Sequence, residues 1–309
     1  MLEQRLAEMD VVYVTRYRVA EQFLPLIREL SANPPILFNN AGLHFLRETR
    51  VMLNQGVNEL GIAQVQNTRE RELAACRSAD AVLCYTAEEH AVITSDLLEK
   101  KNLQLTPGVV EMHKSVAGFA ERKGIAFLGN FAHKPNEEAL LFLLKEVMPC
   151  LLAQHSHDIT LIVFRSNTPE DFKKYTSANV NIEGYVEDID DVYNIHHLFV
   201  APLLSGAGIK GEVLESMAYG LPTILTDLAA EGIGVVHGLN TLIANNVDEW
   251  VESILNLYRD ESQRTKTSEN QRVLARTKYL RQAGLKRFRS IFQSVGVSVL
   301  EAEIEVESQ

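Results

Sequence analysis

A glycine-containing loop between an apolar run and a helix-like segment constrains this chain more than any other feature of its sequence. Residues 197–203 read HLFVAPL, which is typical of a buried strand in a parallel sheet. Residues 204–220 then read LSGAGIKGEVLESMAYG, where Gly206 and Gly208 let the backbone turn tightly and approach a ligand, because neither has a Cβ. A helix that begins there directs free N–H groups at that ligand, which suits a diphosphate, although the pattern alone also fits an ordinary tight turn.

Short apolar runs alternate with amphipathic segments along the whole chain, which predicts βαβ units and parallel sheets. Strands are expected at residues 11–14, 36–39, 81–85, 103–106, 125–129, 159–164, 180–185, 198–203, 222–226 and 241–245. Helices are expected at residues 19–30, 45–78 with a break near 54–61, 87–100, 135–154, 169–176, 188–195, 209–219 and 247–259.

The composition is that of a soluble globular protein. Hydrophobic residues make up 46% and charged residues 23% of 309 residues, enough chain for two domains. No stretch approaches the roughly 20 apolar residues of a membrane span, and the N-terminus lacks the features of a signal peptide. The three cysteines have no metal-like spacing and fit a reducing cytoplasm, so we expect a cytoplasmic protein, with the inner membrane face left open.

The charge is spread unevenly. The formal net charge of −11 argues against a nucleic-acid partner. Residues 1–124 hold 14 basic and 16 acidic residues, whereas the remainder holds 16 and 25. The nearly neutral first part leaves peripheral membrane contact or an anionic acceptor open, although interleaved Glu and Arg residues also fit ordinary solvated helix faces.

Three further segments complete a recognisable pattern around the glycine loop. They read FLGNFAHKPNEEALLFLLKEVMP (127–149), ITLIVFRSN (159–167) and VNIEGYVEDIDDVYNIHH (180–197). Together with the loop they resemble the donor-binding domain of GT-B glycosyltransferases, in the large retaining group that uses nucleotide-sugar donors. More weakly, DVVYVTRYRVAEQFLPLIREL, ILFNNAGLHFLRETR and SADAVLCYT resemble the second half of the acceptor domain in that family.

The resemblance implies an α/β chain of two doubly wound Rossmann-like domains, the first of them incomplete. On this basis we divide the chain into a partial acceptor-side domain (1–107), a linker (108–124), a donor-binding domain (125–280), a C-terminal helix (281–295) and an acidic, disordered tail (296–309). About three βα units of the family's first domain lack a counterpart. The chain is therefore expected to be a fragment, one subunit of a split enzyme, or a shortened homologue.

The resemblance also assigns a donor site. Lys210 and the loop amides would hold the diphosphate, and Glu215 would accept the ribose hydroxyls, since a carboxylate accepts two hydrogen bonds. The base-binding wall would lie at 184–187 and contact the base through its main chain. The expected donor-binding residues are Gly129, Asn130, Val186, Gly206, Ala207, Gly208, Ile209, Lys210 and Glu215.

Several positions depart from the family pattern or admit two interpretations. Leu204 and Glu212 stand where the subgroup often has Arg and Lys, which removes positive charge beside the expected phosphate. His44, in NNAGLHFLRE, is the candidate catalytic residue, either orienting an acceptor hydroxyl or steadying the leaving phosphate; ordinary packing at a helix start is the alternative. We expect no metal site, because the acidic run at 188–191 fits the start of a helix.

The sequence therefore predicts a glycosyltransferase that moves a sugar from a nucleoside diphosphate sugar to a glycan or lipid-linked acceptor, with retention and without a further cofactor. The rival hypothesis is a non-catalytic nucleotide-sugar-binding remnant, or one subunit of a split glycosyltransferase. The expected partners are the nucleotide-sugar and the acceptor. Whether a second chain completes the first domain is left open.

Overall fold

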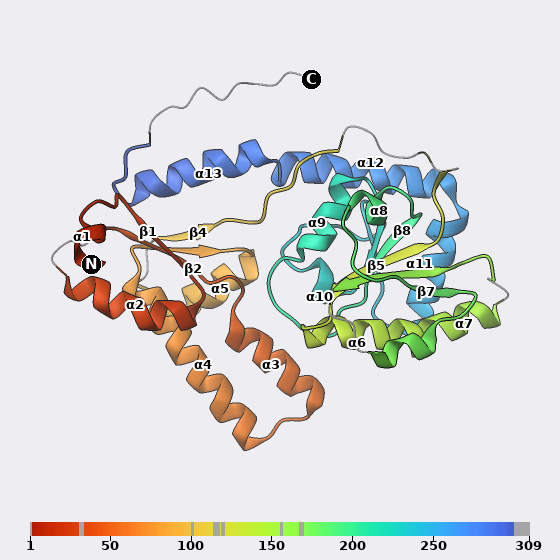
Figure 1. Ribbon diagram of the computed structural model, residues 1–309, viewed down its shortest axis with the longest axis horizontal. Helices are drawn as coiled ribbons and strands as arrows, with labels where there is room; N and C mark the ends of the chain where they lie inside the picture. Colours follow the sequence, from red (N-terminus) through yellow and green to blue (C-terminus); the bar gives the residue numbers. More distant parts are fainter. Residues whose placement is uncertain are drawn as a thin grey trace.

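The structure is a computed structural model that describes residues 2–30, 34–99, 102–113, 118, 121–154, 157–166 and 170–299. Two α/β domains lie side by side, and the C-terminal helices run along one side of both (Figure 1). Each domain holds one parallel sheet, which agrees with the predicted pair of doubly wound domains. Residues 300–309 of the predicted tail (296–309) and residues 114–117, 119 and 120 of the predicted linker lie outside the described residues.

The first domain is built on a four-stranded parallel sheet in the order β1-β2-β3-β4. Its elements are α1 (Leu2–Leu6), β1 (Val12–Thr15), α2 (Tyr17–Glu29), β2 (Ile36–Asn39), α3 (His44–Gln55), α4 (Glu59–Ser78), β3 (Ala81–Cys84), α5 (Ala87–Asp96) and β4 (Leu103–Leu105). The predicted break near 54–61 is present, since α3 ends at Gln55 and α4 begins at Glu59. Helix α1 was not predicted.

Both faces of this first sheet are covered, as the continuous apolar strands require. Along β2, Ile36 and Phe38 join the core shared with α2 and α4, whereas Leu37 faces the opposite side. On that opposite side Leu37 packs with Ile291 of α13 (Arg281–Ser294), because side chains alternate between the faces of a strand. The C-terminal helix of the chain thus covers one face of the first domain (Figure 1).

The second domain has a six-stranded parallel sheet in the order β10-β9-β8-β5-β6-β7. Its strands are β5 (Ile125–Asn130), β6 (Leu161–Ser166), β7 (Val180–Ile182), β8 (Leu198–Ala201), β9 (Thr223–Leu225) and β10 (Leu242–Ile243). Its helical segments are α6 (Lys134–Phe142), a π-helical turn (Leu143–Val147), α7 (Met148–Ala153), a 3₁₀ turn (Glu170–Tyr175), α8 (Asp190–Tyr193), α9 (Gly211–Ala218), α10 (Asp227–Ala230), α11 (Val247–Arg259) and α12 (Glu261–Lys278).

Several helices differ from their predicted form. The single helix expected at 135–154 contains a π-helical turn between α6 and α7, and the helix expected at 169–176 is a 3₁₀ turn. Helix α9 begins at Gly211 rather than at residue 209, because Lys210 has an extended backbone and forms the N-cap. Helices α10 and α12 were not predicted at all.

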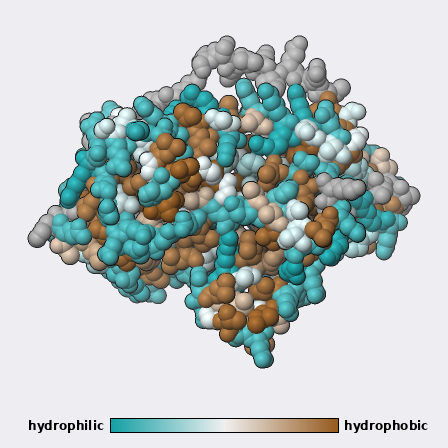
Figure 2. Space-filling view, turned by 180° about the vertical axis from the view of Figure 1, so that it is seen from behind, coloured by the Kyte–Doolittle hydropathy of each residue, from teal (hydrophilic) through white to brown (hydrophobic). Residues whose placement is uncertain are grey.

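The helical hairpin α3–α4 projects away from the sheet of the first domain (Figure 1). Its outer end carries exposed apolar side chains, and Figure 2 shows hydrophobic residues on the projecting tip. Leu60 is 85% exposed there, with Leu53 and Val57 also exposed. Arg50 and Asn54, in the second half of α3, lie close to the second domain and form the contacts described below.

Candidate functional site

The second domain offers a ligand site where its strand order reverses. From β5 the chain builds β6 and β7 on one side, then returns to place β8 on the other side of β5. Ligands of open α/β sheets bind at this switch point, beyond the carboxyl ends of the strands. A pocket of about 550 Å³ lies there, lined by Leu128, Gly129, Asn130, His133, Asn136, Tyr185, Val186, Glu187, Ile189 and Glu212.

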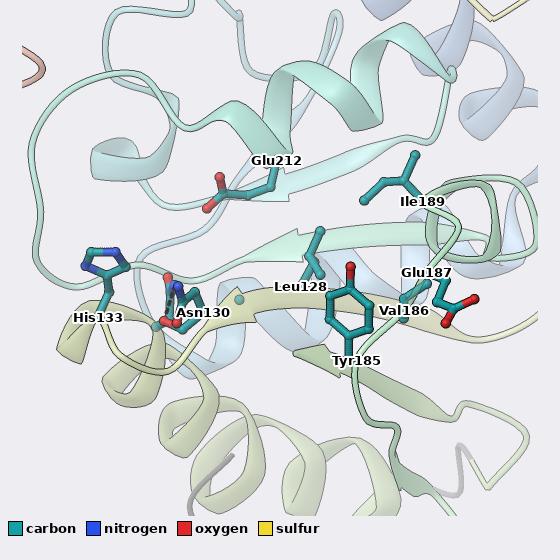
Figure 3. Close-up of a pocket in the computed structure, with 10 residues that line it drawn as sticks. Leu128, Asn130, His133, Tyr185, Val186, Glu187, Ile189 and Glu212 are labelled. Atoms are coloured by element: carbon teal, nitrogen blue, oxygen red, sulfur yellow. Dashed lines mark hydrogen bonds between the residues drawn. The ribbon is translucent and has the colours of Figure 1, made fainter. Parts of the chain in front are cut away.

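The pocket draws its walls from three segments of the second domain (Figure 3). Asn130 and His133 lie where β5 leads into α6, and Tyr185 and Ile189 come from the segment between β7 and α8. Glu212, on the first turn of α9, directs its carboxylate into the space between α9 and β5. The pocket therefore combines apolar walls with an acidic group at the position where the subgroup often carries a lysine.

The corner after β5 is a capped turn that keeps the backbone open to the pocket. Asn136 Nδ2 donates to the carbonyl oxygen of Asn130 at 3.0 Å, and the Asn130 side chain accepts from the backbone N–H of Ala132 at 2.9 Å. A Cβ on Gly129 would lie 3.1 Å from the Cβ of Asn136, so a side chain there would force Asn136 to shift by a few tenths of an ångström. Gly129, Asn130 and Val186 of the predicted site thus line one pocket.

The glycine loop before α9 adopts the backbone that its sequence indicates. Gly206 has a φ of 129° and Gly208 a φ of 77°, both in the region that side chains with a Cβ rarely occupy. The loop does not line the pocket itself, which reaches only Glu212 on the first turn of the following helix. It lies instead between the pocket and the first domain, where Gly208 packs closely against Gly42.

Lys210 closes this loop with a buried ammonium group. Only 8% of the residue is exposed, and Lys210 Nζ donates a short hydrogen bond to the carbonyl oxygen of Gly208. Burial lowers the pKa of Lys210 most, whereas Glu231 and Glu212 act in the opposite direction. The ammonium group is therefore engaged by a carbonyl oxygen of its own loop.

Contacts from α3 attach the glycine loop to the first domain. Arg50 Nη1 donates to the carbonyl oxygen of Gly206 at 2.8 Å, and Asn54 Nδ2 donates to that of Leu204 at 2.7 Å. Arg50 also forms a short ion pair with Glu231, which follows α10 of the second domain. The two domains thus meet at the loop that is expected to hold the diphosphate.

A buried carboxylate lies on the first-domain side of the same contact. Glu89 of α5 is fully buried and accepts backbone hydrogen bonds from Leu43, Tyr85 and Thr86. Burial raises the pKa of Glu89, and the backbone hydrogen bonds oppose that rise. A Cβ on Gly208 would lie 3.5 Å from Glu89 Oε1, so Glu89 reaches the glycine loop from the opposite domain.

Glu215 lies about one turn after Glu212 along α9 and is partly buried. Burial raises the pKa of Glu215, and the neighbouring Glu111 raises it further. Glu215 is not among the residues that line the pocket, so the structure does not bring it together with Gly129, Asn130 and Val186. Its proposed role toward ribose remains a prediction.

His44 begins α3 and is held by a carboxylate of α4. Its Nδ1 lies 2.8 Å from Glu72 Oε1, and its ring packs edge-on against Tyr17 at a centroid separation of 5.0 Å. Because a carboxylate only accepts hydrogen bonds, this contact places the ring proton on Nδ1 and leaves Nε2 as the acceptor. His44 follows Gly42, the residue in contact with the glycine loop, by two positions.

The acidic run at 188–191 opens a helix. Asp188 accepts from the backbone N–H of Asp190 at 2.9 Å, and Asp190 accepts a short hydrogen bond from the hydroxyl of Tyr219. Within the part of the chain that the structure describes, no group of three or more His, Cys, Asp or Glu residues is placed to hold a metal ion.

Sequence reasoning missed two pairings, one between the domains and one within the first domain. Arg50 and Glu231, which connect the two domains, are 181 positions apart in the chain, and Glu72 lies 28 positions after its partner His44. No local pattern signals such pairs, because each arises only when separate elements meet in the fold. The one available signal was the charge of Arg50 on the helix that follows His44.

Two sequence comparisons relate this chain to known proteins. Residues 122–260 match the family model described as "Glycosyl transferases group 1". A curated relative, an uncharacterized 44.6 kDa protein in the cps region of Klebsiella pneumoniae, is 26% identical over 147 residues, which cover 45% of this chain and 38% of the relative.

Solved glycosyltransferase structures share the fold at low identity. A point mutant of S. aureus TarM, in complex with fondaparinux, alpha-GlcNAc-glycerol and UDP, aligns with a TM-score of 0.70 at 14% identity, over 91% of this chain and 55% of TarM. Anabaena HepE in complex with UDP aligns with a TM-score of 0.74 at 12% identity, over 95% of this chain and 81% of HepE. The chain thus spans about half the length of TarM and less than half that of the Klebsiella relative.

Among the residues that the structure describes, no helix has the length and apolar character needed to cross a membrane.

Proposed function

Because residues 122–260 form a group 1 glycosyltransferase domain within a GT-B fold, we propose that this chain takes part in sugar transfer from a nucleoside diphosphate sugar. The observation that carries the proposal is the pocket at the switch point between β5 and β8, with the glycine loop and α9 beside it. A nucleoside in the pocket would direct its diphosphate toward the first turn of α9, where free N–H groups favour anions.

The roles follow from position and chemistry. The main chain at 184–187 would contact the base, and Glu215 would accept the ribose hydroxyls. Lys210 and the loop amides would stabilise the negative charge that develops on the departing diphosphate, which is the main electrostatic task in such a transfer. The acceptor, a glycan or a lipid-linked saccharide, would lie on the side of His44, and the reaction would retain the anomeric configuration.

Support for the donor class comes from the neighbours, since TarM and HepE are both seen in complex with UDP. The test is a panel of nucleoside diphosphate sugars incubated with the purified chain, with release of the free nucleoside diphosphate as the readout and Lys210→Ala as the control. Donor-dependent release from the wild type and a much slower release from the variant are the expected result. NMR of the released or transferred sugar then reports retention or inversion.

A second candidate function, nucleotide-sugar binding without turnover, is favoured by one observation. Glu212 directs a carboxylate into the pocket, where it opposes the charge of a diphosphate (Figure 3). Tight binding of a nucleotide-sugar with no release or transfer, including in a mixture with a chain that supplies further first-domain strands, would favour this candidate over the enzyme.

A further inference from the structure

The charged side chains around the glycine loop determine how a diphosphate would be neutralised there. Lys210 is buried and donates to the Gly208 carbonyl oxygen. The other side chains that influence it electrostatically are mostly acidic, namely Glu231, Glu212 and Glu89. A diphosphate placed at this loop would therefore meet more negative than positive charge from the second domain.

The first domain supplies a second cation at the same place. Arg50 belongs to α3, yet its Nη1 lies 2.8 Å from the Gly206 carbonyl oxygen, one residue before Ala207. The guanidinium also acts on Lys210, whose pKa its charge lowers. Lys210 belongs to the loop, and Arg50 reaches the same loop from the other domain. Together they would supply two positive charges to a bound diphosphate.

Glu231 holds Arg50 in this position through an ion pair, which can open again. One carboxylate oxygen of Glu231 pairs with Arg50 Nη2, and the other is buried without a hydrogen-bond partner among the described residues. The Arg50 side chain is 23% exposed and the Glu231 side chain 14% exposed, so the pair is partly screened from water. A guanidinium carries five N–H donors in a planar fork, so it can keep the loop carbonyl and still bind a phosphate oxygen.

We propose that Arg50 is a donor-binding residue that contributes, from the first domain, positive charge to the diphosphate held at the loop 206–210. This inference rests on the proposed function, because it assumes that a nucleoside diphosphate occupies the pocket. It has a mechanical consequence: donor binding strengthens the contact between α3 and the glycine loop, so the diphosphate helps to hold the two domains together. Arginine suits this role better than lysine, because its five N–H donors lie in a fixed planar fork that can reach the loop carbonyl oxygen, Glu231 and a phosphate oxygen with separate N–H groups.

The alternative is that Arg50 only holds the loop in shape through the Gly206 carbonyl. Two ligands separate these roles: the nucleoside diphosphate that binds the wild type most tightly among UDP, GDP, ADP, CDP and TDP, and its nucleoside without phosphates. If Arg50 contacts phosphate, Arg50→Gln weakens the diphosphate by roughly tenfold or more and leaves the nucleoside unchanged, the scale of one charge-assisted hydrogen bond. Arg50→Lys keeps part of the affinity, because it keeps the charge.

Two control variants match these changes. Asn54→Ala removes a neutral contact between the same helix and the same loop, at the Leu204 carbonyl oxygen. It should leave the ratio of nucleoside to diphosphate affinity as in the wild type. Arg69→Gln removes a guanidinium that pairs with Asp96 of α5, and it should leave both affinities unchanged. Folding of each variant is checked by its urea midpoint.

The outcomes are distinct. A loss confined to the diphosphate in Arg50→Gln, with partial recovery in Arg50→Lys, supports the inference. An equal loss for nucleoside and diphosphate, or no loss for either, overturns it while leaving the proposed function in place. If none of the five nucleoside diphosphates binds the wild type, the proposed function fails and this inference fails with it.

Discussion

Glu72 of α4 holds the first turn of α3 through His44: its Oε1 accepts from His44 Nδ1 at 2.8 Å and from the His44 backbone N–H at 2.9 Å. The second oxygen of Glu72 accepts from the backbone N–H of Phe45 at 3.0 Å. Helix α3 has no side-chain cap of its own from its N-cap residue Leu43, so Glu72 satisfies donors that the helix end would otherwise leave unpaired.

A first prediction follows for stability. Glu72→Gln replaces one accepting oxygen by an NH₂ group, which cannot accept from the backbone N–H groups at the start of α3. We expect the free energy of unfolding to fall by about 1–3 kcal/mol, the cost of a buried donor without a partner. Urea denaturation measures this, with Glu70→Gln at an exposed position of the same helix as the control. Equal stability of Glu72→Gln and the wild type would contradict this role.

A second prediction concerns the chemistry at His44. If Nε2 orients an acceptor hydroxyl, His44→Ala should lower the rate of transfer by about 100-fold or more, the scale of a lost general acid–base group. The affinity for the nucleoside diphosphate should stay unchanged, because in this role His44 contacts the acceptor and not the diphosphate. Steady-state transfer kinetics and calorimetry on the same preparations test both statements. A weaker diphosphate affinity at an unchanged rate would assign His44 to the leaving phosphate instead.

The fold of the second domain was predictable because its strands are buried on both faces and separated by turn residues. Gly206 and Gly208 show the positive φ values that a tight strand-to-helix loop requires. Helix α12 escaped prediction for a physical reason: its buried side chains are largely polar. Gln271 Nε2 donates to Thr223 Oγ1 at 2.5 Å, and Arg272 donates to the Ala218 carbonyl oxygen at 3.0 Å, so no apolar period marks the helix.

The candidate site was predictable only where it lies within one domain. Gly129, Asn130 and Val186 line one pocket, because residues that follow neighbouring strands of a parallel sheet meet at its carboxyl edge. The pairing of Arg50 with Glu231 depends on how the two domains meet, and a single sequence carries no signal of that. The engagement of Lys210 by the Gly208 carbonyl oxygen lies within one loop, but it depends on the loop conformation, which the residue pattern does not specify.

A third prediction concerns the acidic group in the pocket. Glu212→Gln removes a negative charge that points into the pocket, and the side chain keeps its size (Figure 3). We expect nucleoside diphosphates to bind several-fold more tightly and nucleosides to bind as before, since the removed repulsion acts on phosphate. The gain should shrink at high salt, which screens charges in an open pocket. An unchanged diphosphate affinity would show that Glu212 does not repel the donor, and a weaker one would show that the carboxylate binds it.

A fourth prediction uses the pH dependence of donor binding. Burial lowers the pKa of Lys210 below its usual value of 10.5, and a bound diphosphate favours the charged ammonium. Affinity is therefore greatest below the lowered pKa and falls as the pH rises through it. Titrations between neutral and alkaline pH measure this fall. Lys210→Gln should abolish it, and a fall that persists in that variant would assign the dependence to another group.

The central claim is that the glycine loop and the adjoining pocket bind a nucleoside diphosphate without a metal ion. Isothermal titration calorimetry of the wild type with UDP, GDP, ADP, CDP and TDP, each with and without EDTA, tests it most directly. We predict that at least one of the five binds, that EDTA leaves its affinity unchanged, and that Lys210→Ala weakens it by about 1.5–3 kcal/mol. Failure of all five to bind the wild-type chain would contradict the claim.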